Sequence, residues 1–187
     1  MPMRKVFLFM MVSLDGYFEG PKHDLSWHNV DAEFNESFAI PQLQQADTLL
    51  FGRRTYELMA SYWPTKLAHK DDRVVADLMN KTPKFVFSHK LKRVDWQNAT
   101  LVSHDASGVV RKLKAAKGKD IAIFGSNNLS VSLLDSGLID ELRIMVNPVS
   151  IGKGTPLFKG IKKKPKLKLL SSRTFKNGNV LLTYKVS

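Results

Sequence analysis

The chain of 187 residues contains no cysteine and few histidines. A disulfide framework and a metal site built on thiolates are therefore excluded. The five histidines are scattered, with no pair at the spacing of metal ligands, so no metal site is predicted. Because disulfides are rare in reducing compartments, the lack of cysteine fits the cytoplasm, which is the location we expect.

Several sequence motifs of common enzymes are also missing. There is no G-x-S-x-G turn of a serine hydrolase, no P-loop, and no G-x-G-x-x-G fingerprint of the usual dinucleotide-binding fold. If a dinucleotide binds to this chain, it must therefore be held by a different arrangement of strands and helices.

Long hydrophobic runs are absent as well. The apolar part of residues 1–13 is short compared with the roughly 20 residues of a membrane span. It runs into Asp15 and Gly16 without a small-residue cleavage site, so we interpret it as a first core strand and not as a secretion signal. We expect no membrane association and, from the chain length, one domain over residues 1–187.

Acidic residues are outnumbered, with 17 Asp and Glu against 29 Lys and Arg, which gives a net charge of +12. A basic surface of this kind is found in nucleic-acid-binding proteins. Here the excess lies mainly in residues 111–119 and 159–168, and no helix-turn-helix, zinc-finger or aromatic RNA-binding motif accompanies it. We expect no nucleic-acid partner and favour an anionic small molecule, with nucleic acid as the weaker alternative.

Strand-like and helix-like segments alternate along the chain. Strands are predicted at residues 4–14, 48–51, 84–88, 99–103, 120–124 and 142–149. Helices are predicted at residues 31–45, with Pro41 bending or ending the regular part, and at 55–61, 71–80, 109–117 and 128–136. Loops are predicted at 15–21 and 152–156, and a hairpin at 166–186 around Asn177-Gly178. This order predicts an α/β fold: a mostly parallel central sheet flanked by helices, with an antiparallel C-terminal hairpin.

Two glycine turns, at residues 52–55 and 125–129, each join a predicted strand to a predicted helix. Glycine lets the backbone approach a ligand, and the helix N-terminus behind it presents free N–H groups to an anion. Arg53 and Arg54 are unfavourable for the dipole of the helix that they begin, which makes sense beside an anion. Two solvated arginines in a tight turn are the equal alternative. On neighbouring parallel strands, the two turns would hold both ends of one elongated phosphate ligand.

Polar residues also follow the first predicted strand. Ser13, Asp15 and Gly16 stand at its carboxyl end, where ligands bind in sheets of this kind. Asp15 is the candidate catalytic carboxylate, and the alternative is an aspartate that bonds the backbone of its own turn.

Cations cluster at the ends of two further strands. Arg53 and Arg54 follow one, and the segment Ser88-His89-Lys90 follows the next. Cations at one edge of a sheet would favour a 2′-phosphate, and therefore NADPH over NADH.

Four segments together resemble the dihydrofolate reductase-like superfamily: residues 13–16, 47–57, 137–142 and 147–158. The nearest branch is the C-terminal reductase domain of bifunctional riboflavin-biosynthesis proteins and its stand-alone relatives. The resemblance covers nearly the whole chain, and the order and spacing of the segments are more specific than any one of them. It implies an NADPH-binding sheet and a homodimer.

The resemblance also implies which residues contact the cofactor. The phosphates would be held by Gly52, Arg53, Arg54 and Thr55, and the 2′-phosphate by Ser88, His89 and Lys90. The pyrophosphate and nicotinamide would lie over Gly125, Ser126, Asn127, Asn128 and Leu129, and Ser13, Asp15 and Gly16 would lie near the nicotinamide and the substrate.

The chain departs from the family pattern at two places. The riboflavin branch usually has Glu-Gly-Gly where this chain has Phe124-Gly125-Ser126, and the substrate-binding acid of dihydrofolate reductases has no clear equivalent among Asp31, Glu33 and Glu36. We expect an NADPH-dependent reductase of the 5-amino-6-(5-phosphoribosylamino)uracil reductase type, acting on a small anionic acceptor, with Asp15 or a bound water as proton donor. The alternatives are a nucleotide-binding module without turnover and a reductase acting on a pterin.

Overall fold

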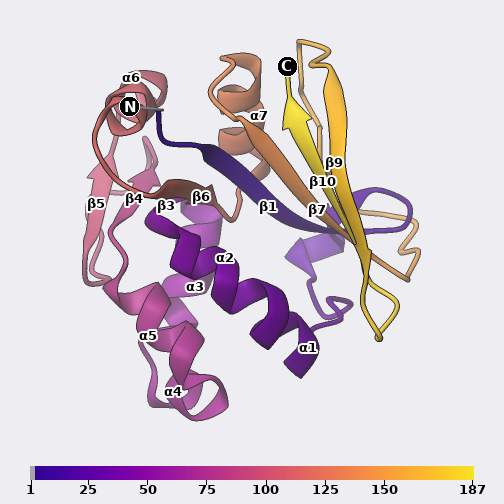
Figure 1. Cartoon of the computed structure of the whole chain (residues 1–187). Helices are drawn as coiled ribbons and strands as arrows, with labels where there is room; N and C mark the ends of the chain where they lie inside the picture. The colour runs from indigo at the N-terminus through magenta and orange to yellow at the C-terminus, as the bar shows by residue number, and fades with distance from the viewer. Residues whose placement is uncertain (1–2) are drawn as a thin grey trace.

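The computed structural model describes residues 3–187 and is organised around one large sheet (Figure 1). Its strands are β1 (Val6–Ser13), β3 (Ala46–Gly52), β4 (Lys84–Phe87), β5 (Ala99–Val102), β6 (Asp120–Ile123), β7 (Glu141–Asn147), β9 (Leu167–Thr174) and β10 (Val180–Val186). They lie in the order β5-β4-β3-β6-β1-β7-β10-β9. The first six are parallel to one another. Strand β10 is antiparallel to both of its neighbours, β7 and β9. The predicted fold class, including the C-terminal hairpin, is confirmed.

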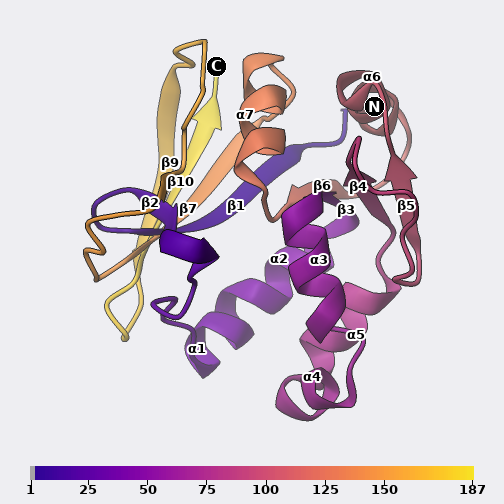
Figure 2. The same cartoon turned by 180° about the vertical axis from the view of Figure 1, so that it is seen from behind.

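Helices cover both faces of this sheet (Figures 1 and 2). They are α1 (Ala32–Phe34), α2 (Ile40–Gln45), α3 (Arg53–Tyr62), α4 (Lys66–Asp71), α5 (Arg73–Lys81), α6 (Ala106–Ala115) and α7 (Asn127–Asp135). A single turn of 3-10 helix spans Pro21–His23. Within residues 3–187, no helix combines the length and the apolar composition that crossing a bilayer requires.

The alternation of side chains along β1 explains the two layers of the core. Val6 and Leu8 face one side, where they pack with apolar residues of α6 and α7. Phe7 faces the other side and packs with residues of α2, α3 and α5. A strand that is apolar on both faces is required here, because both faces of a parallel sheet are covered by helices.

The helix predicted at residues 31–45 continues past Pro41 to Gln45. A π-helical segment, Asn35–Ala39, joins α1 to α2, so that helical backbone continues to Gln45. The Ile40 N–H donates to the carbonyl of Asn35 five residues earlier, which marks the widened turn just before the proline. The widened turn accommodates the missing N–H of Pro41, and the prediction that Pro41 bends or ends the helix is therefore wrong about the ending.

A second small sheet forms in segments that were predicted as loops. Strand β2 (Tyr17–Glu19) pairs antiparallel with β8 (Thr155–Pro156). The pairing depends on Gly154, which has a φ of 157° and whose added Cβ would lie 2.1 Å from the Glu19 carbonyl oxygen. These strands are too short to be recognised by a period of two residues, and only the close approach of the two segments forms them.

Lys84 is fully buried and gives the first testable prediction. Its ammonium donates to the carbonyls of Asn80 and Thr82 and lies 4.5 Å from the centre of the Trp96 ring. Burial of the charge lowers the pKa of Lys84 from 10.5 to about 8. Between these two values the unfolded chain retains a proton that the folded protein has released, so the free energy of unfolding rises with pH.

For Lys84 alone, this rise amounts to about 3 kcal/mol between the two pKa values. Urea unfolding of the native protein and of Lys84→Met at neutral pH and near pH 10 measures it. The native protein is expected to gain stability relative to the variant as the pH rises. Identical pH dependence of the two proteins would contradict the prediction.

Candidate functional site

Two helices begin side by side at the carboxyl edge of the sheet, where β3 and β6 are neighbours. Gly52 is the N-cap of α3 and Ser126 is the N-cap of α7, and neither helix start is capped by a side-chain hydrogen bond. The Gly52 N–H donates to the Gly125 carbonyl at 3.3 Å. The expectation that the two glycine turns lie on neighbouring parallel strands is confirmed, and the first N–H groups of both helices remain open to an anion.

Gly52 allows the two helix starts to lie this close together. A Cβ at this position would lie 2.0 Å from the Ser126 hydroxyl oxygen and 3.0 Å from the Ser126 Cβ. At Gly125, whose φ is 107°, an added Cβ would lie 2.8 Å from the Thr55 hydroxyl oxygen. Both glycines are therefore required by the packing, and they leave a cradle of backbone N–H groups.

The two arginines of the first turn of α3 have different surroundings. The Arg53 guanidinium donates to both carboxylate oxygens of Glu57, at 3.1 and 3.2 Å. Arg54 is exposed, and its guanidinium lies 3.5 Å from His23 Nδ1. Among residues 3–187, Arg54 forms no ion pair with a carboxylate, so it is the cation of this turn that remains available to a ligand.

The segment after β4 lies next to the start of α3, because Gly52 and Phe87 are partners in the register of β3 and β4. The Ser88 hydroxyl accepts hydrogen bonds from the N–H groups of Lys90 and Leu91, both at 3.1 Å, and so shapes the turn. The side chains of His89 and Lys90 are left exposed.

His104 joins this group, although the sequence did not single it out. It follows β5, and its ring lies 5.8 Å from the ring of His89. The parallel pairing of β4 with β5 brings their carboxyl ends together. A predicted strand order would have revealed this pair, whereas the spacing of the histidines in the sequence does not.

The start of α7 uses its side chains for structure. The buried Asn127 amide donates to the carbonyls of Pro156 and Leu157, and Leu129 is buried in the core. Asn128 is exposed. A cofactor contact by this segment would therefore come from backbone N–H groups and the Ser126 hydroxyl, and not from the side chains of Asn127 or Leu129.

The loop after β1 gives Asp15 a structural role. Its carboxylate accepts hydrogen bonds from the Ser150 hydroxyl at 2.9 Å and from the N–H groups of Ile151 and Gly152 at 3.2 and 2.7 Å. The Ser13 hydroxyl and these three donors hold the pKa of Asp15 well below its usual range. These donors give the Asp15 carboxylate a structural role in the loop, and its role as proton donor stays a prediction.

The other two residues predicted beside Asp15 also support the loop. The buried Ser13 hydroxyl accepts from the Tyr17 N–H at 3.1 Å and lies 3.3 Å from the Tyr17 carbonyl oxygen. Gly16 has a φ of 86°, and its carbonyl accepts from the Leu157 N–H at 3.2 Å. The loop thus fixes the segment that precedes β2.

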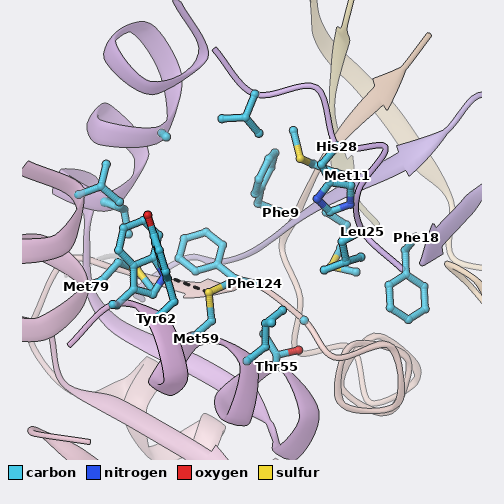
Figure 3. Close-up of a pocket in the computed structure, with 18 of the residues that line it drawn as sticks. Phe9, Met11, Phe18, Leu25, His28, Thr55, Met59, Tyr62, Met79 and Phe124 are labelled. Carbon is cyan, nitrogen blue, oxygen red and sulfur yellow. Dashed lines mark hydrogen bonds between the residues drawn. The ribbon is translucent and has the colours of Figure 1, made fainter. Parts of the chain in front are cut away.

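A cavity of about 740 Å³ opens beside the two helix starts (Figure 3). Phe9 of β1 and Phe124 after β6 face each other edge to face across its floor, with ring centres 6.2 Å apart. The α1–α2 helix forms one wall, and α3 with α5 forms the other. The cavity reaches Arg54, Thr55 and Gly125, so it is continuous with the cradle between α3 and α7.

The three acids considered at the start of the first helix do not line this cavity. Asp31 caps α1 by accepting from the Phe34 N–H at 2.8 Å, and Glu33 accepts from the Lys176 N–H at 3.0 Å. Glu36 is exposed. Among the residues that the structure describes, no group of three or more acids and histidines is arranged to hold a metal ion.

The model of the RibD C-terminal domain matches residues 4–181 of this chain. The uncharacterised protein YyaP of Bacillus subtilis (strain 168) is 33% identical over 181 residues, which cover 97% of this chain and 94% of the relative. YyaP therefore aligns along almost its full length.

Three solved structures share the fold. A protein from Shewanella sp. PV-4, provisionally named for riboflavin biosynthesis, has a TM-score of 0.74 and 24% identity and covers 98% of this chain and 99% of its own. The diaminohydroxyphosphoribosylaminopyrimidine deaminase/5-amino-6-(5-phosphoribosylamino)uracil reductase of Thermotoga maritima has a TM-score of 0.72 and 16% identity; the match covers 99% of this chain and 57% of that one. Dihydrofolate reductase from Enterococcus faecalis, complexed with NADP(H), has a TM-score of 0.65 and 12% identity over 98% and 96% of the two chains. The fold is that of dihydrofolate reductase-like proteins.

Proposed function

Because the chain belongs to the RibD C-terminal domain family, we propose that it is a reductase that binds NADPH across the carboxyl edge of its sheet. The observation that carries the proposal is the cradle between Gly52 and Ser126, where two helix N-termini without side-chain caps meet so closely that a Cβ on Gly52 would overlap the Ser126 hydroxyl. Such a cradle suits a pyrophosphate, since both helix dipoles and the open N–H groups favour negative charge.

Different residues around the cradle would hold different parts of the cofactor. The N–H groups at the start of α3 and α7 would hold the pyrophosphate, and Arg54 would lie beside it. His89 and Lys90 would hold the adenosine 2′-phosphate, with His104 next to them. The nicotinamide would then lie over Gly125, at the mouth of the cavity, where it supplies a hydride to an acceptor bound inside.

A nucleotide-binding module without turnover is the second candidate. The features that favour it are Phe124 and Ser126, which stand where the riboflavin branch has glutamate and glycine. Oxidation of NADPH by the protein in the presence of any acceptor would exclude this candidate.

A pterin reductase is less well supported. The carboxylate expected on the first helix is absent from the cavity wall, because Asp31 and Glu33 bond elsewhere and Glu36 is exposed. The cavity supports a reductase with a different acceptor.

The cofactor proposal is tested by calorimetric titration of the purified protein with NADPH and, separately, with NADH. NADPH is expected to bind more tightly. The double variant Arg54→Ala/Lys90→Ala is expected to lose most of this preference, with roughly a tenfold weaker affinity for NADPH for each lost charged hydrogen bond.

The control for this titration is Arg111→Ala, which removes an exposed cation on α6 and should leave binding unchanged. The proposal fails if neither cofactor binds. Equal affinity for the two cofactors would contradict the assignment of His89 and Lys90 to the 2′-phosphate. It would not contradict the assignment of the cradle to the pyrophosphate.

A homodimer and a cytoplasmic location stay predictions from the sequence. In support of association between two copies, the edge strand β9 is exposed along its whole length and carries three exposed leucines, Leu167, Leu169 and Leu170.

A further inference from the structure

Most of the side chains that line the cavity are aromatic, methionine or aliphatic, and the labelled ones among them point toward one another in Figure 3. They come from segments far apart in the sequence: Phe9 and Met11 of β1, Leu25 and Val30 of the loop before α1, Phe34 and Leu43 of the α1–α2 helix, Leu58, Met59 and Trp63 of α3 and its C-cap, Val75 and Met79 of α5, and Phe124. Methionine and aromatic side chains of this kind fit flat rings well.

Carboxylates on the wall of the cavity are all engaged by the protein. Glu19 accepts hydrogen bonds from Thr155 and contacts His23, each at 2.8 Å. The Tyr62 hydroxyl donates to Asp71 at 2.8 Å. The other two acids of the lining are occupied as the partner of Arg53 and the N-cap of α5, namely Glu57 and Asp72. Within residues 3–187, each lining carboxylate therefore already has a partner, which the amino groups of a pyrimidine or pterin would have to share.

The unsatisfied polar atoms on the wall are neutral. His28 Nε2 and Gln42 Oε1 are buried without a hydrogen-bond partner among the described residues. Burial lowers the pKa of His28, so its imidazole is uncharged at neutral pH. The arginines of the lining, Arg53 and Arg54, come from the start of α3, next to the cofactor cradle, and the Arg54 guanidinium lies 3.5 Å from His23 Nδ1.

This distribution of charge disfavours a sugar phosphate inside the cavity. A phosphate bound away from the start of α3, where both lining arginines lie, would lose its hydration without gaining a cation, and the hydroxyl groups of the sugar would face phenylalanine and methionine. A flat apolar ring would gain roughly 25 cal/mol for each Å² of apolar surface that is buried, together with stacking against Phe9 and Phe124.

Building on the proposed function, we infer that the acceptor is a neutral, flat, conjugated carbonyl compound of the quinone class. Such a quinone would take a hydride, and with it two electrons, from the reduced nicotinamide of the proposed cofactor. The negative charge would rest on a ring oxygen, where conjugation spreads it, and one proton from water would complete the hydroquinone. This chemistry needs no acid from the protein, in agreement with a cavity whose carboxylates are all engaged.

Binding can be tested without the cofactor, using menadione, a neutral naphthoquinone. Trp63 lines the cavity, so bound menadione should quench tryptophan fluorescence to saturation. The chain has no cysteine that menadione could modify covalently, so quenching reports reversible binding. Ribose phosphate should not displace it.

Two matched variants locate the binding. Leu25→Asp places a charge on the cavity wall, at a partly exposed loop residue, and should weaken menadione binding at least about tenfold. Leu67→Asp makes the same change at an exposed leucine of α4 outside the cavity and should have no effect. Equal affinity of both variants, or displacement by ribose phosphate, would overturn the inference.

The outcome is separable from that of the proposed function. Loss of menadione binding with intact NADPH binding would overturn the acceptor class alone. A protein that binds neither cofactor but binds menadione, and loses that binding in Leu25→Asp, would support the assignment of the cavity. It would overturn the proposed reductase function. Support for both requires NADPH oxidation by menadione that is impaired in Leu25→Asp and unchanged in Leu67→Asp.

Discussion

Replacement of Gly52 by alanine should reduce NADPH affinity by roughly a hundredfold, since misplacement of binding groups by about 1 Å has effects of this size. The new methyl group would overlap the Ser126 hydroxyl, whose oxygen would be only 2.0 Å away, and would press on the Ser126 Cβ and backbone N. The start of α3 must then move away from the start of α7. Calorimetric titration of Gly52→Ala with NADPH measures the loss, and circular dichroism shows whether the variant is folded.

The same overlap predicts a rescue. Ser126→Gly removes both the hydroxyl and the Cβ that the new methyl group would meet, and leaves only the backbone N, at 3.3 Å. The double variant Gly52→Ala/Ser126→Gly should therefore bind NADPH more tightly than Gly52→Ala, and Ser126→Gly alone measures what the Ser126 hydroxyl contributes to binding. Native affinity in Gly52→Ala, or a folded double variant that binds no better than Gly52→Ala, would show that the cradle is not where the cofactor binds.

The parts of this site that could be predicted from the sequence are those encoded locally. A buried strand, a glycine and a helix follow one another at Gly52 and again at Gly125, and the alternation of strands and helices makes the two strands parallel. The position of both helix starts at the carboxyl edge of the sheet was therefore predictable. The contact between Gly52 and Ser126 was not, because it depends on β3 and β6 being neighbours in the sheet.

The parts that could not be predicted depend on pairs of residues far apart in the chain. Asp15 has the sequence context of a strand-end acid, yet its partners lie in the loop 150–152, and only the fold brings them together. The cavity is a similar case: Phe9, Met59 and Met79 each have the pattern of core residues, and the structure leaves space between them. An apolar side chain at a cavity wall and one in a packed core have the same sequence pattern.

The N-terminal end of β1 shows the same limit in a purely structural residue. Arg4 is the first residue of a predicted strand, but its buried side chain joins three parts of the chain. The guanidinium donates to the Lys119 carbonyl at 2.6 Å, to the Leu113 carbonyl at 3.2 Å, and to the Thr48 hydroxyl at 2.8 Å. It also forms an ion pair with Asp47. Nothing in the local sequence distinguishes Arg4 from a solvated arginine before a strand.

Arg4→Met should lower the free energy of unfolding by about 2–4 kcal/mol, because Arg4 is buried while its partner Asp47 is partly exposed and screened by water. The methionine fills much of the space, but two carbonyls lose their donor and the Asp47 carboxylate loses its cation. Arg4→Lys keeps the charge but loses the planar set of donors. Its free energy of unfolding should therefore lie between those of the native protein and Arg4→Met. Urea unfolding of the three proteins measures the difference, and a loss below about 1 kcal/mol in Arg4→Met would mean that these contacts resemble an exposed ion pair. In that case, the junction of β3 with the α6–β6 loop would be held by packing alone.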